Sequence, residues 1–475
     1  MRGKQWEIHA AYGGLSASAL GRIMGDRRLN PFTQSELLAA ALAMPFKETG
    51  RAHYRSLIQD ERDRRPYEQR QIVDGLTWLE RLGLERSPFD GFATLPRYSF
   101  ALELRFELAR PYLSRDDDAF YIIDNPVRKD KVFKVPFMAP TSWKGSLRAV
   151  ATQGLLAAFA PLLPDKPPTE EAEREALLSR LWEERVQRVL LFGNEKKNNA
   201  NFLNRWLAPR LFPDSPDESE KDRRERLAKQ AKQLGDAFEQ YLKENHYRTE
   251  KIEGRQGRLF CFPTFFNRIG LEIINPHDRR RRVGKNPILF ECVPARATGT
   301  FRLLYVPYDW PGEVTLDEAT LRRQVQADLP LVADTVCDLL TVYGFGAKTS
   351  SGFGTADSRR VEGELRVNRL DEGAEAAEGP SESLVRRRLM GDPLEHRLHD
   401  DFFVAGQFVL VPDDEIKQQP WKGKVRADYK KVKPRVLELQ AEQPAGPIYL
   451  ARPVRDLSDL PNLARELAEI VGGAV

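Results

Sequence analysis

Two segments, about two hundred residues apart, combine side chains that could bind and cut a phosphate chain. The first begins with Asp124, inside the run Ile-Asp-Asn-Pro-Val, and continues through residues 136–148, which carry the cations Lys144 and Arg148. The second, residues 343–354, reads Tyr-Gly-Phe-Gly-Ala-Lys-Thr-Ser-Ser-Gly-Phe-Gly. Glycine lets a backbone approach a ligand closely, and cations neutralise phosphates. The two segments predict an RNA-binding protein, with Asp124 placed where it could help to cut the RNA.

The first segment contains a predicted helix from Ser142 to Phe159. Its Ser-Trp-Lys-Gly start resembles a capped helix entry, where free backbone N–H groups favour a phosphate. Lys144 and Arg148 lie four residues apart and therefore share one face of that helix. We expect Ser142, Lys144 and Arg148 to contact RNA. The alternative is that the two cations lie on a solvated helix face.

The second segment is a glycine-rich loop that also carries hydrogen-bond donors. Its glycines permit positive φ angles and close backbone approach. Its spacing matches neither a Walker A loop nor a dinucleotide-binding loop, which argues against a nucleotide-dependent enzyme. A tight structural turn is the alternative to RNA-backbone binding. The residues expected to contact RNA are Gly344, Gly346, Lys348, Thr349 and Gly352.

Further basic clusters lie outside these two segments. The densest run is Arg-Arg-Arg-Arg at 279–282, and we expect Arg280, Arg281 and Arg282 to contact RNA. A solvated loop is the alternative for this run. The nearby His277 could act as an acid or a base, although a lone histidine is more often structural. Residues 421–433 mix aromatic rings with cations, as single-strand binders do.

Overall composition gives only a weak bias toward any partner. The formal net charge is +4 over 475 residues, so nucleic-acid binding rests on the local clusters. No apolar run reaches bilayer length and the first residues form no signal-peptide core, so we expect a cytoplasmic protein without a membrane partner. The three cysteines are scattered in no zinc-site or disulfide pattern, so we expect them to be packing residues.

Periodicity divides the chain into sections. Apolar residues alternate from Phe100 to Leu108 and predict a strand. Further strands are expected near 258–263, 287–293 and 300–307, and helices near 169–191, 218–244, 316–342 and 461–471. The order strand, helix, strands, helix suits an α+β fold with a ferredoxin-like (RRM-like) βαββαβ core, whose open sheet often binds single-stranded RNA. The expected sections are a helical N-terminal region at 1–95, the core at 96–160 and 256–370, a helical insertion at 161–255, an acidic linker at 371–400 and a small C-terminal extension at 401–475.

The motifs resemble the RAMP superfamily of CRISPR-associated proteins, and most of all the backbone subunit of type III effector complexes. Family members carry an Ile-Asp-x-Pro-Val-type segment, then Pro-x-Ile-Pro-Gly-Ser-Ser-Leu-Lys-Gly-x-x-Arg, and later Gly-x-Gly-x-Lys-Thr-x-x-Gly-x-Gly. The chain matches at 123–127, 136–148 and 344–354. The family's Gly-Ser-Ser-Leu-Lys is Pro-Thr-Ser-Trp-Lys here, so Trp143 either stacks on the guide RNA or packs within the protein.

The resemblance implies a subunit that binds the guide RNA (crRNA) backbone and cleaves bound target RNA, beside other effector subunits. It maps Asp124 onto the catalytic acid and implies a β-hairpin thumb, which we place within residues 258–300. In that reaction the target's 2′-OH attacks the adjacent phosphate, so the acid must bind Mg²⁺ or accept a proton. One carboxylate can suffice when the substrate phosphate completes the metal site, because Mg²⁺ keeps several waters.

Three alternatives remain open. Asp124 could be a turn residue in Asp-Asn-Pro, which would make the chain a non-catalytic scaffold of the same complex. The acids at 116–118 could bind an accessory metal, although a solvated loop is the simpler interpretation. A guide-processing endonuclease of the same superfamily often uses a histidine, and no histidine lies beside the matched motifs.

Overall fold

The computed structural model describes residues 17–41, 47–59, 65–115, 123, 125–194, 197–213, 218–245, 247, 256–275, 277–278, 283–284, 287–307, 318–368, 402, 410–411, 416, 419–421, 423–441 and 449–473. Asp124 and residues 280–282, which the sequence singled out, lie outside the described residues. None of the helices in the described part of the chain combines the length and the hydropathy that a bilayer crossing requires.

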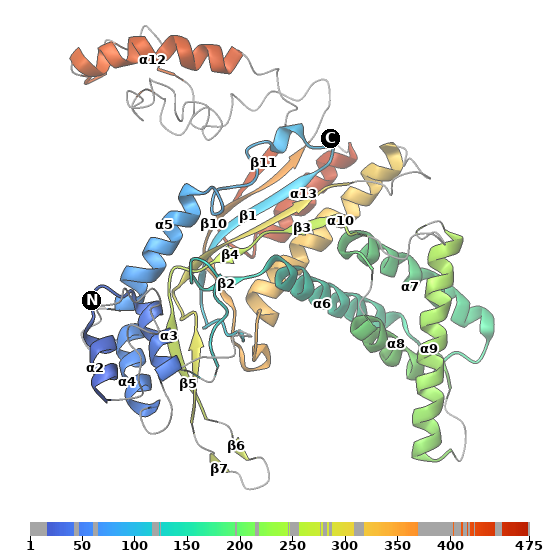
Figure 1. The fold of residues 1–475 in the computed structure, drawn as a ribbon. Helices are drawn as coiled ribbons and strands as arrows, with labels where there is room; N and C mark the ends of the chain where they lie inside the picture. The colour runs from blue at the N-terminus through green and yellow to red at the C-terminus, as the bar shows by residue number, and fades with distance from the viewer. Residues whose placement is uncertain are drawn as a thin grey trace.

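A five-stranded antiparallel sheet forms the centre of the molecule (Figure 1). Its strands lie in the order β11-β10-β1-β9-β3. Their bounds are β1 Phe100–Leu108, β3 Leu259–Cys261, β9 Thr298–Tyr305, β10 Ala356–Asn368 and β11 Tyr449–Val454. The alternation predicted for β1 is confirmed, because Leu104 and Phe106 are buried while Arg105 between them is exposed.

Two helices connect the central strands in the expected order. Helix α6 (Pro140–Phe159) follows β1 and precedes β3, and α10 (Glu318–Asp338) connects β9 to β10. A π-helical turn (Leu339–Tyr343) extends α10 to the glycine loop. The predicted α+β class is therefore confirmed, and β1, α6, β3, β9, α10 and β10 follow the expected βαββαβ order. Side chains of α6 and α10, such as Leu147 and Leu329, share one hydrophobic cluster with Leu104 of the sheet.

Two of the alternate residues of β1, Glu103 and Glu107, form ion pairs with neighbouring strands. Glu103 lies opposite Arg302 of β9, and its Oε2 is 3.2 Å from the Arg302 Nε. The Arg302 Nη1 is also 3.6 Å from the Glu85 Oε1. Burial raises the pKa of Glu85 to about 7, and Arg302 opposes that shift. Arg302 therefore pairs with two carboxylates on this side of the sheet.

A β-ribbon projects from the core (Figure 1). Strand β5 (Gly270–Ile274) pairs with β8 (Ile288–Cys292), and β6 (His277–Asp278) pairs with β7 (Val283–Gly284) further out. Ile273 is 69% exposed on this ribbon. A separate short pair joins β2 (Phe137–Met138) to β4 (Thr264–Phe265). A hairpin thus lies within residues 258–300, where the resemblance implied a thumb.

The N-terminal region is helical, as predicted. Its elements are α2 (Ala17–Gly25), α3 (Pro31–Ala41), α4 (Lys47–Ile58), a π-helical turn (Glu68–Ile72), α5 (Val73–Arg81) and a 3₁₀ turn (Phe92–Thr94). The buried side chains Leu38, Tyr54 and Leu79 belong to the same hydrophobic cluster as the sheet. Helix α4 also contacts β5 of the ribbon. The N-terminal helices therefore pack on the core next to the base of the ribbon.

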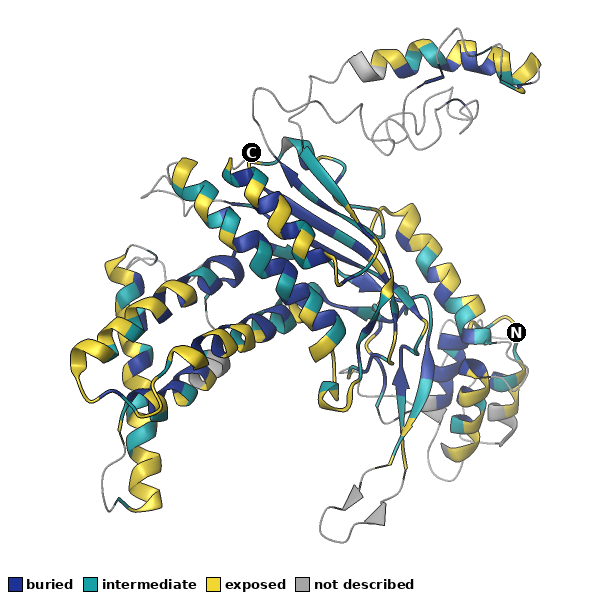
Figure 2. Cartoon of the chain, turned by 180° about the vertical axis from the view of Figure 1, so that it is seen from behind, coloured by how far each residue is buried: buried dark blue, intermediate teal, exposed yellow. Residues whose placement is uncertain are grey.

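Three helices occupy the predicted insertion: α7 (Glu171–Phe192), α8 (Lys197–Leu211) and α9 (Glu220–Glu244), after a 3₁₀ turn at Ala160–Leu162. Helix α8 was not predicted, because Pro209 and an asparagine-rich start weaken its helical pattern. Trp182 and Phe238 lie in a cluster that continues onto Leu155 and Phe159 of α6. Figure 2 shows the exposed residues on the outer sides of these helices and the buried residues facing inward.

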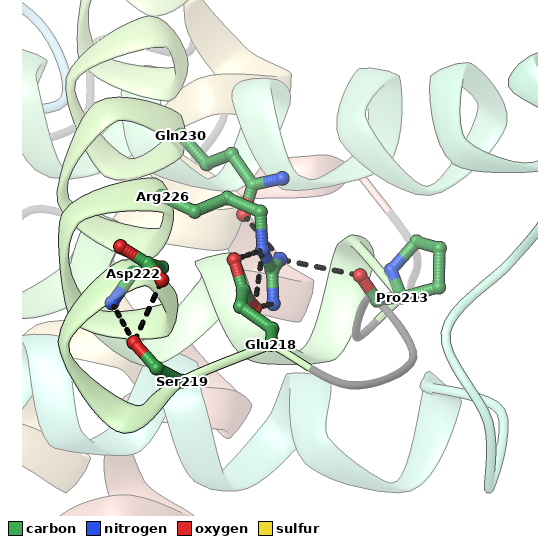
Figure 3. A network of polar contacts seen from close by, with 6 residues as sticks. All are labelled: Pro213, Glu218, Ser219, Asp222, Arg226 and Gln230. Carbon is green, nitrogen blue, oxygen red and sulfur yellow. Dashed lines mark hydrogen bonds and ion pairs between the residues drawn. The ribbon is translucent and has the colours of Figure 1, made fainter.

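A polar network fixes the start of α9 (Figure 3). Ser219 is the N-cap, and its hydroxyl accepts a hydrogen bond from the Asp222 backbone N–H at 3.2 Å. Arg226 donates to both carboxylate oxygens of Glu218, at 3.0 Å from Nε and 2.9 Å from Nη2. Its Nη1 donates to the Pro213 carbonyl at 3.2 Å. The network therefore ties the chain after α8 to the first turns of α9.

The C-terminal part of the chain completes the core. Strand β11 adds an edge to the sheet beside β10, and α13 (Leu460–Gly472) packs against α10. Strand β11 was not predicted, because Pro453 masks the strand pattern; proline is tolerated here since β11 is an edge strand. Helix α12 (Gly423–Ala441), which was not predicted, forms a small cluster with Phe402 and Trp421. Residues 371–400 lie outside the described part.

Candidate functional site

The glycine loop packs against the chain segment that leads toward Asp124. The Ala347 N–H donates to the Leu113 carbonyl at 2.7 Å. The Gly354 N–H donates to the Pro111 carbonyl at 2.8 Å. These bonds hold both arms of the loop on residues that follow β1. The structure thereby brings together the two motifs that the sequence separates.

The Lys348 side chain contacts strand β8 of the ribbon. Its ammonium lies 5.5 Å from the centre of the Phe290 ring. The backbone of Phe290 pairs with Asn125, the residue directly after Asp124. Lys348 itself is exposed and has a left-handed backbone, with φ of 59°. A cation of the glycine loop therefore lies close to the start of the acid-bearing segment.

An aromatic cluster joins two of the three matched motifs, residues 136–148 and 344–354, to β1 and the residues after it. Phe345 of the glycine loop lies 4.6 Å from Trp143 of α6 and 5.4 Å from Tyr112, as ring centroids. Trp143 is fully buried, and its Nε1 donates to the Thr264 Oγ1 at 3.0 Å. Trp143 therefore packs within the protein, which decides between the two roles that the sequence left open. Edge-on contact with Phe106 of β1 anchors the cluster to the sheet.

The glycines of the loop have two roles: some allow close packing against neighbouring backbone, and others leave the backbone open to solvent. Gly346 has φ of 90°, and a Cβ there would lie 2.3 Å from the Leu113 carbonyl oxygen. Gly352 has φ of 81°, yet a Cβ there would meet nothing within 4 Å. Residues 346–348 and 350–352 are exposed. One side of the loop is thus a tight structural turn, and the other is an open backbone surface with Lys348 and Thr349 on it.

Contacts at the base of the acid-bearing segment fix its two ends to each other. The Ser114 hydroxyl accepts a hydrogen bond from the Arg128 N–H at 2.8 Å. Tyr112 forms a bridge with Val293 at the end of β8. The Asn125 carbonyl accepts from the Glu291 N–H at 2.9 Å. Residues 116–118 and Asp124 lie outside the described residues. The described residues Tyr112 and Asn125, before and after them, form backbone hydrogen bonds with Val293 and Glu291 at the end of β8.

The buried carboxylate of Glu291 contacts the residues that follow Asp124 in the chain. Glu291 is fully buried and accepts hydrogen bonds from the Val127 N–H at 3.0 Å and the Lys129 ammonium at 2.5 Å. The Tyr54 hydroxyl of α4 donates to its other oxygen. Burial raises the pKa of Glu291, and the bond from Val127 opposes that shift. This cluster was not predicted from the sequence, although the acid inside the apolar run Ile-Leu-Phe-Glu-Cys-Val was a signal for it.

The cations of α6 already have partners within the protein. The Lys144 ammonium donates to the Leu259 carbonyl at the sheet edge, at 2.7 Å, and burial lowers its pKa. The Arg148 guanidinium donates to the Phe192 carbonyl at the end of α7. Ser142 is exposed, but it does not cap the helix, because α6 begins at Pro140. RNA contact by Ser142, Lys144 and Arg148 remains a prediction.

The remaining predicted residues divide into two groups. Residues 280–282 lie outside the described part, and of His277 only the backbone strand is described. Trp421 and Tyr429 are described and buried against each other, so their rings face the α12 cluster. Among the described residues, no group of three or more His, Cys, Asp or Glu side chains lies close enough to hold a metal ion.

Comparisons with known proteins agree with the motifs. The sequence matches the RAMP superfamily over residues 77–357, more than half of the chain. No curated protein sequence matches it.

Three solved structures are similar to the chain at low identity. One is a chain of the type III-B Cmr-beta complex bound to cognate target RNA, with 11% identity, a TM-score of 0.35, and coverage of 73% of this chain and 99% of that one. A second belongs to a CRISPR RNA-guided surveillance complex, pre-nicking, with 10% identity, a TM-score of 0.30, and coverage of 78% and 100%. A third is Csc2 of Thermofilum pendens, with 15% identity, a TM-score of 0.27, and coverage of 68% and 85%. At these TM-scores the likenesses add no argument about the site. The family match covers β1, α6, α10 and the glycine loop, and the chain therefore belongs to the RAMP superfamily.

Proposed function

We propose that this chain is an RNA-binding subunit of a type III CRISPR effector complex, which holds guide RNA and cuts bound target RNA through Asp124. The observation that carries the proposal is the convergence of the two motifs. Lys348 and the open glycine backbone lie beside Phe290, whose backbone pairs with the residue after Asp124. A phosphate chain held by the glycine loop would pass next to the acid. The partners would be crRNA, target RNA and neighbouring effector subunits.

The chemistry follows from one carboxylate beside an RNA phosphate. Asp124 would orient the target's 2′-OH for in-line attack and either accept its proton or help to bind Mg²⁺. A divalent cation would supply charge stabilisation on the phosphate. One carboxylate together with phosphate oxygens suits Mg²⁺, which binds few protein ligands and keeps several waters. Glu291 is not a further ligand in this scheme, because both its oxygens accept hydrogen bonds within a fully buried cluster.

The test replaces Asp124 in the assembled ribonucleoprotein. We expect Asp124→Ala to abolish one cleavage site on an end-labelled target RNA and to leave target affinity unchanged, because an acid beside phosphates does not contribute attraction. Asp118→Ala, from the same segment, is the matched control and should cut at every site. Products should carry a 2′,3′-cyclic phosphate and a 5′-OH, and omission of divalent cations should stop cutting.

Each outcome separates the candidate roles. Equal cutting by Asp124→Ala and wild type at all sites would make the chain a non-catalytic scaffold, as the turn-forming Asp-Asn-Pro sequence allows. Loss of cutting in Asp118→Ala but not in Asp124→Ala would assign the catalytic role to the acids at 116–118. Cutting in the presence of a chelator would remove Mg²⁺ from the proposal and leave Asp124 as a proton acceptor.

A further inference from the structure

The buried cluster of Glu291, Lys129 and Tyr54 has no part in the proposed chemistry. Lys129 is 4% exposed and Glu291 is fully buried, so both charges are removed from water. Desolvation makes such a pair a weak source of stability, and apolar replacements of similar volume often fold as well. Stability alone therefore does not account for the cluster. Its location suggests a geometric role.

The cluster links three parts of the chain that are distant in sequence. Tyr54 belongs to α4, Glu291 belongs to β8 of the ribbon, and Val127 and Lys129 directly follow the Asp124 segment. Val127 lies three residues after Asp124, within about 10 Å of extended chain. A shift of the Glu291 carboxylate would thus move the end of the segment that carries the acid.

We propose that Glu291, Lys129 and Tyr54 form a positioning cluster that sets the Asp124 segment relative to the ribbon and the glycine loop. This inference rests on the proposed function for its effect on cutting. The N-terminal helices would then help to position the Asp124 segment, because Tyr54 of α4 donates a hydrogen bond to Glu291. None of the three residues needs to touch RNA. Each acts on Asp124 through the backbone of residues 125–129.

Hydrogen exchange tests the geometry without any activity. The Val127 amide is protected by its bond to Glu291, so Tyr54→Phe should speed its exchange in the isolated protein. Tyr67→Phe is the matched control, since Tyr67 is a buried tyrosine packed edge-on against Tyr54. We expect faster exchange across residues 123–130 in Tyr54→Phe and in the double variant Lys129→Met/Glu291→Gln. Wild-type exchange in both would overturn the proposal.

Cutting supplies the functional readout. At saturating target, Tyr54→Phe should lower the single-turnover rate at this subunit's site by about tenfold, because a displacement near 1 Å can cost about a hundredfold. Target Kd should not change. Faster exchange with wild-type cutting, while Asp124→Ala is inactive, would sink the positioning role; an active Asp124→Ala would instead sink the proposed function.

Discussion

The Lys348 ammonium lies 5.5 Å from the centre of the Phe290 ring, and this contact connects the glycine loop to the ribbon. A cation over an exposed aromatic face contributes about 0.5–1 kcal/mol. Lys348 also adopts a left-handed backbone, with φ of 59°, which is uncommon outside glycine. The loop therefore presents this side chain from a constrained position. A phosphate bound there would lie next to the residue pair formed by Phe290 and Asn125.

Lys348→Ala should weaken guide-RNA binding and flatten its salt dependence. Loss of one phosphate contact lowers the slope of log affinity against log salt by about 0.7 for a single strand. Arg323→Ala is the matched control, because Arg323 is an exposed cation near the start of α10, about 30 Å of helix away from the loop. Filter binding between about 50 and 200 mM salt gives both slopes. Equal slopes for the two variants would mean that Lys348 is a solvated surface residue that does not bind an RNA phosphate.

Gly346→Ala should destabilise the protein more than Gly352→Ala. Both glycines have positive φ, which costs an alanine about 1–2 kcal/mol. At Gly346 the added Cβ would also collide with the Leu113 carbonyl, whereas at Gly352 it would enter open space. Chemical denaturation should therefore rank the two unfolding free energies. Similar losses would mean that the Leu113 contact relaxes without cost, and that the glycine serves RNA approach rather than packing.

Sequence periodicity was sufficient for elements whose packing is simple. Strand β1 and helices α6, α7, α9 and α10 each bury a regular set of apolar residues, so the pattern in sequence is the pattern in space. Strand β11 carries Pro453, and α8 contains Pro209, so local signals opposed the structure that tertiary contacts impose. Edge position and burial against neighbours decide such elements, and neither is visible in one sequence.

The site was predictable in its motifs but not in its contacts. The spacing of glycines and cations identified the loop around Lys348, because backbone conformation depends on local residue type. The partners of Lys144 and Arg148 were not predictable, since the Leu259 and Phe192 carbonyls come from distant segments. The same reason hid Glu291, whose partners come from α4 and from the chain after Asp124.

The burial of Glu85 beside Arg302 predicts a pH dependence of stability. Burial raises the pKa of Glu85 from its ordinary value of 4.5 to about 7, against the opposing effect of Arg302. The folded state therefore binds the proton more tightly than the unfolded state. This contribution is fully present below pH 4.5 and is lost as the pH rises through about 7. Its total is at most about 3 kcal/mol.

Comparison with Glu85→Gln isolates this effect from all other titrations. The amide cannot ionise, so its unfolding free energy should fall less between pH 5 and pH 8 than that of wild type. Urea denaturation at several pH values measures the difference. Parallel pH profiles for the two proteins would show that Arg302 holds Glu85 ionised across the whole range.

Replacing residues 165–255 with a short Gly/Ser linker tests how far the insertion is part of the core. Leu155 and Phe159 of α6 share a buried cluster with Trp182 and Phe238, and this truncation would expose them. It would also remove Gln187, which donates to the buried Asp328 carboxylate at 2.9 Å. Loss of several such contacts should lower Tm by about 10 °C or more. Calorimetry of the truncated and intact proteins gives the comparison.

The matched control changes the outer surface of the insertion and leaves its interior intact. Lys221 and Lys229 are exposed on α9, so Lys221→Glu/Lys229→Glu should keep the wild-type Tm. If that double variant loses guide RNA or partner subunits during purification while remaining folded, the charged face of α9 contacts one of them. A truncated protein with wild-type Tm would instead show that α6 tolerates exposure of Leu155 and Phe159, and that α7–α9 add an interaction surface without supporting the core.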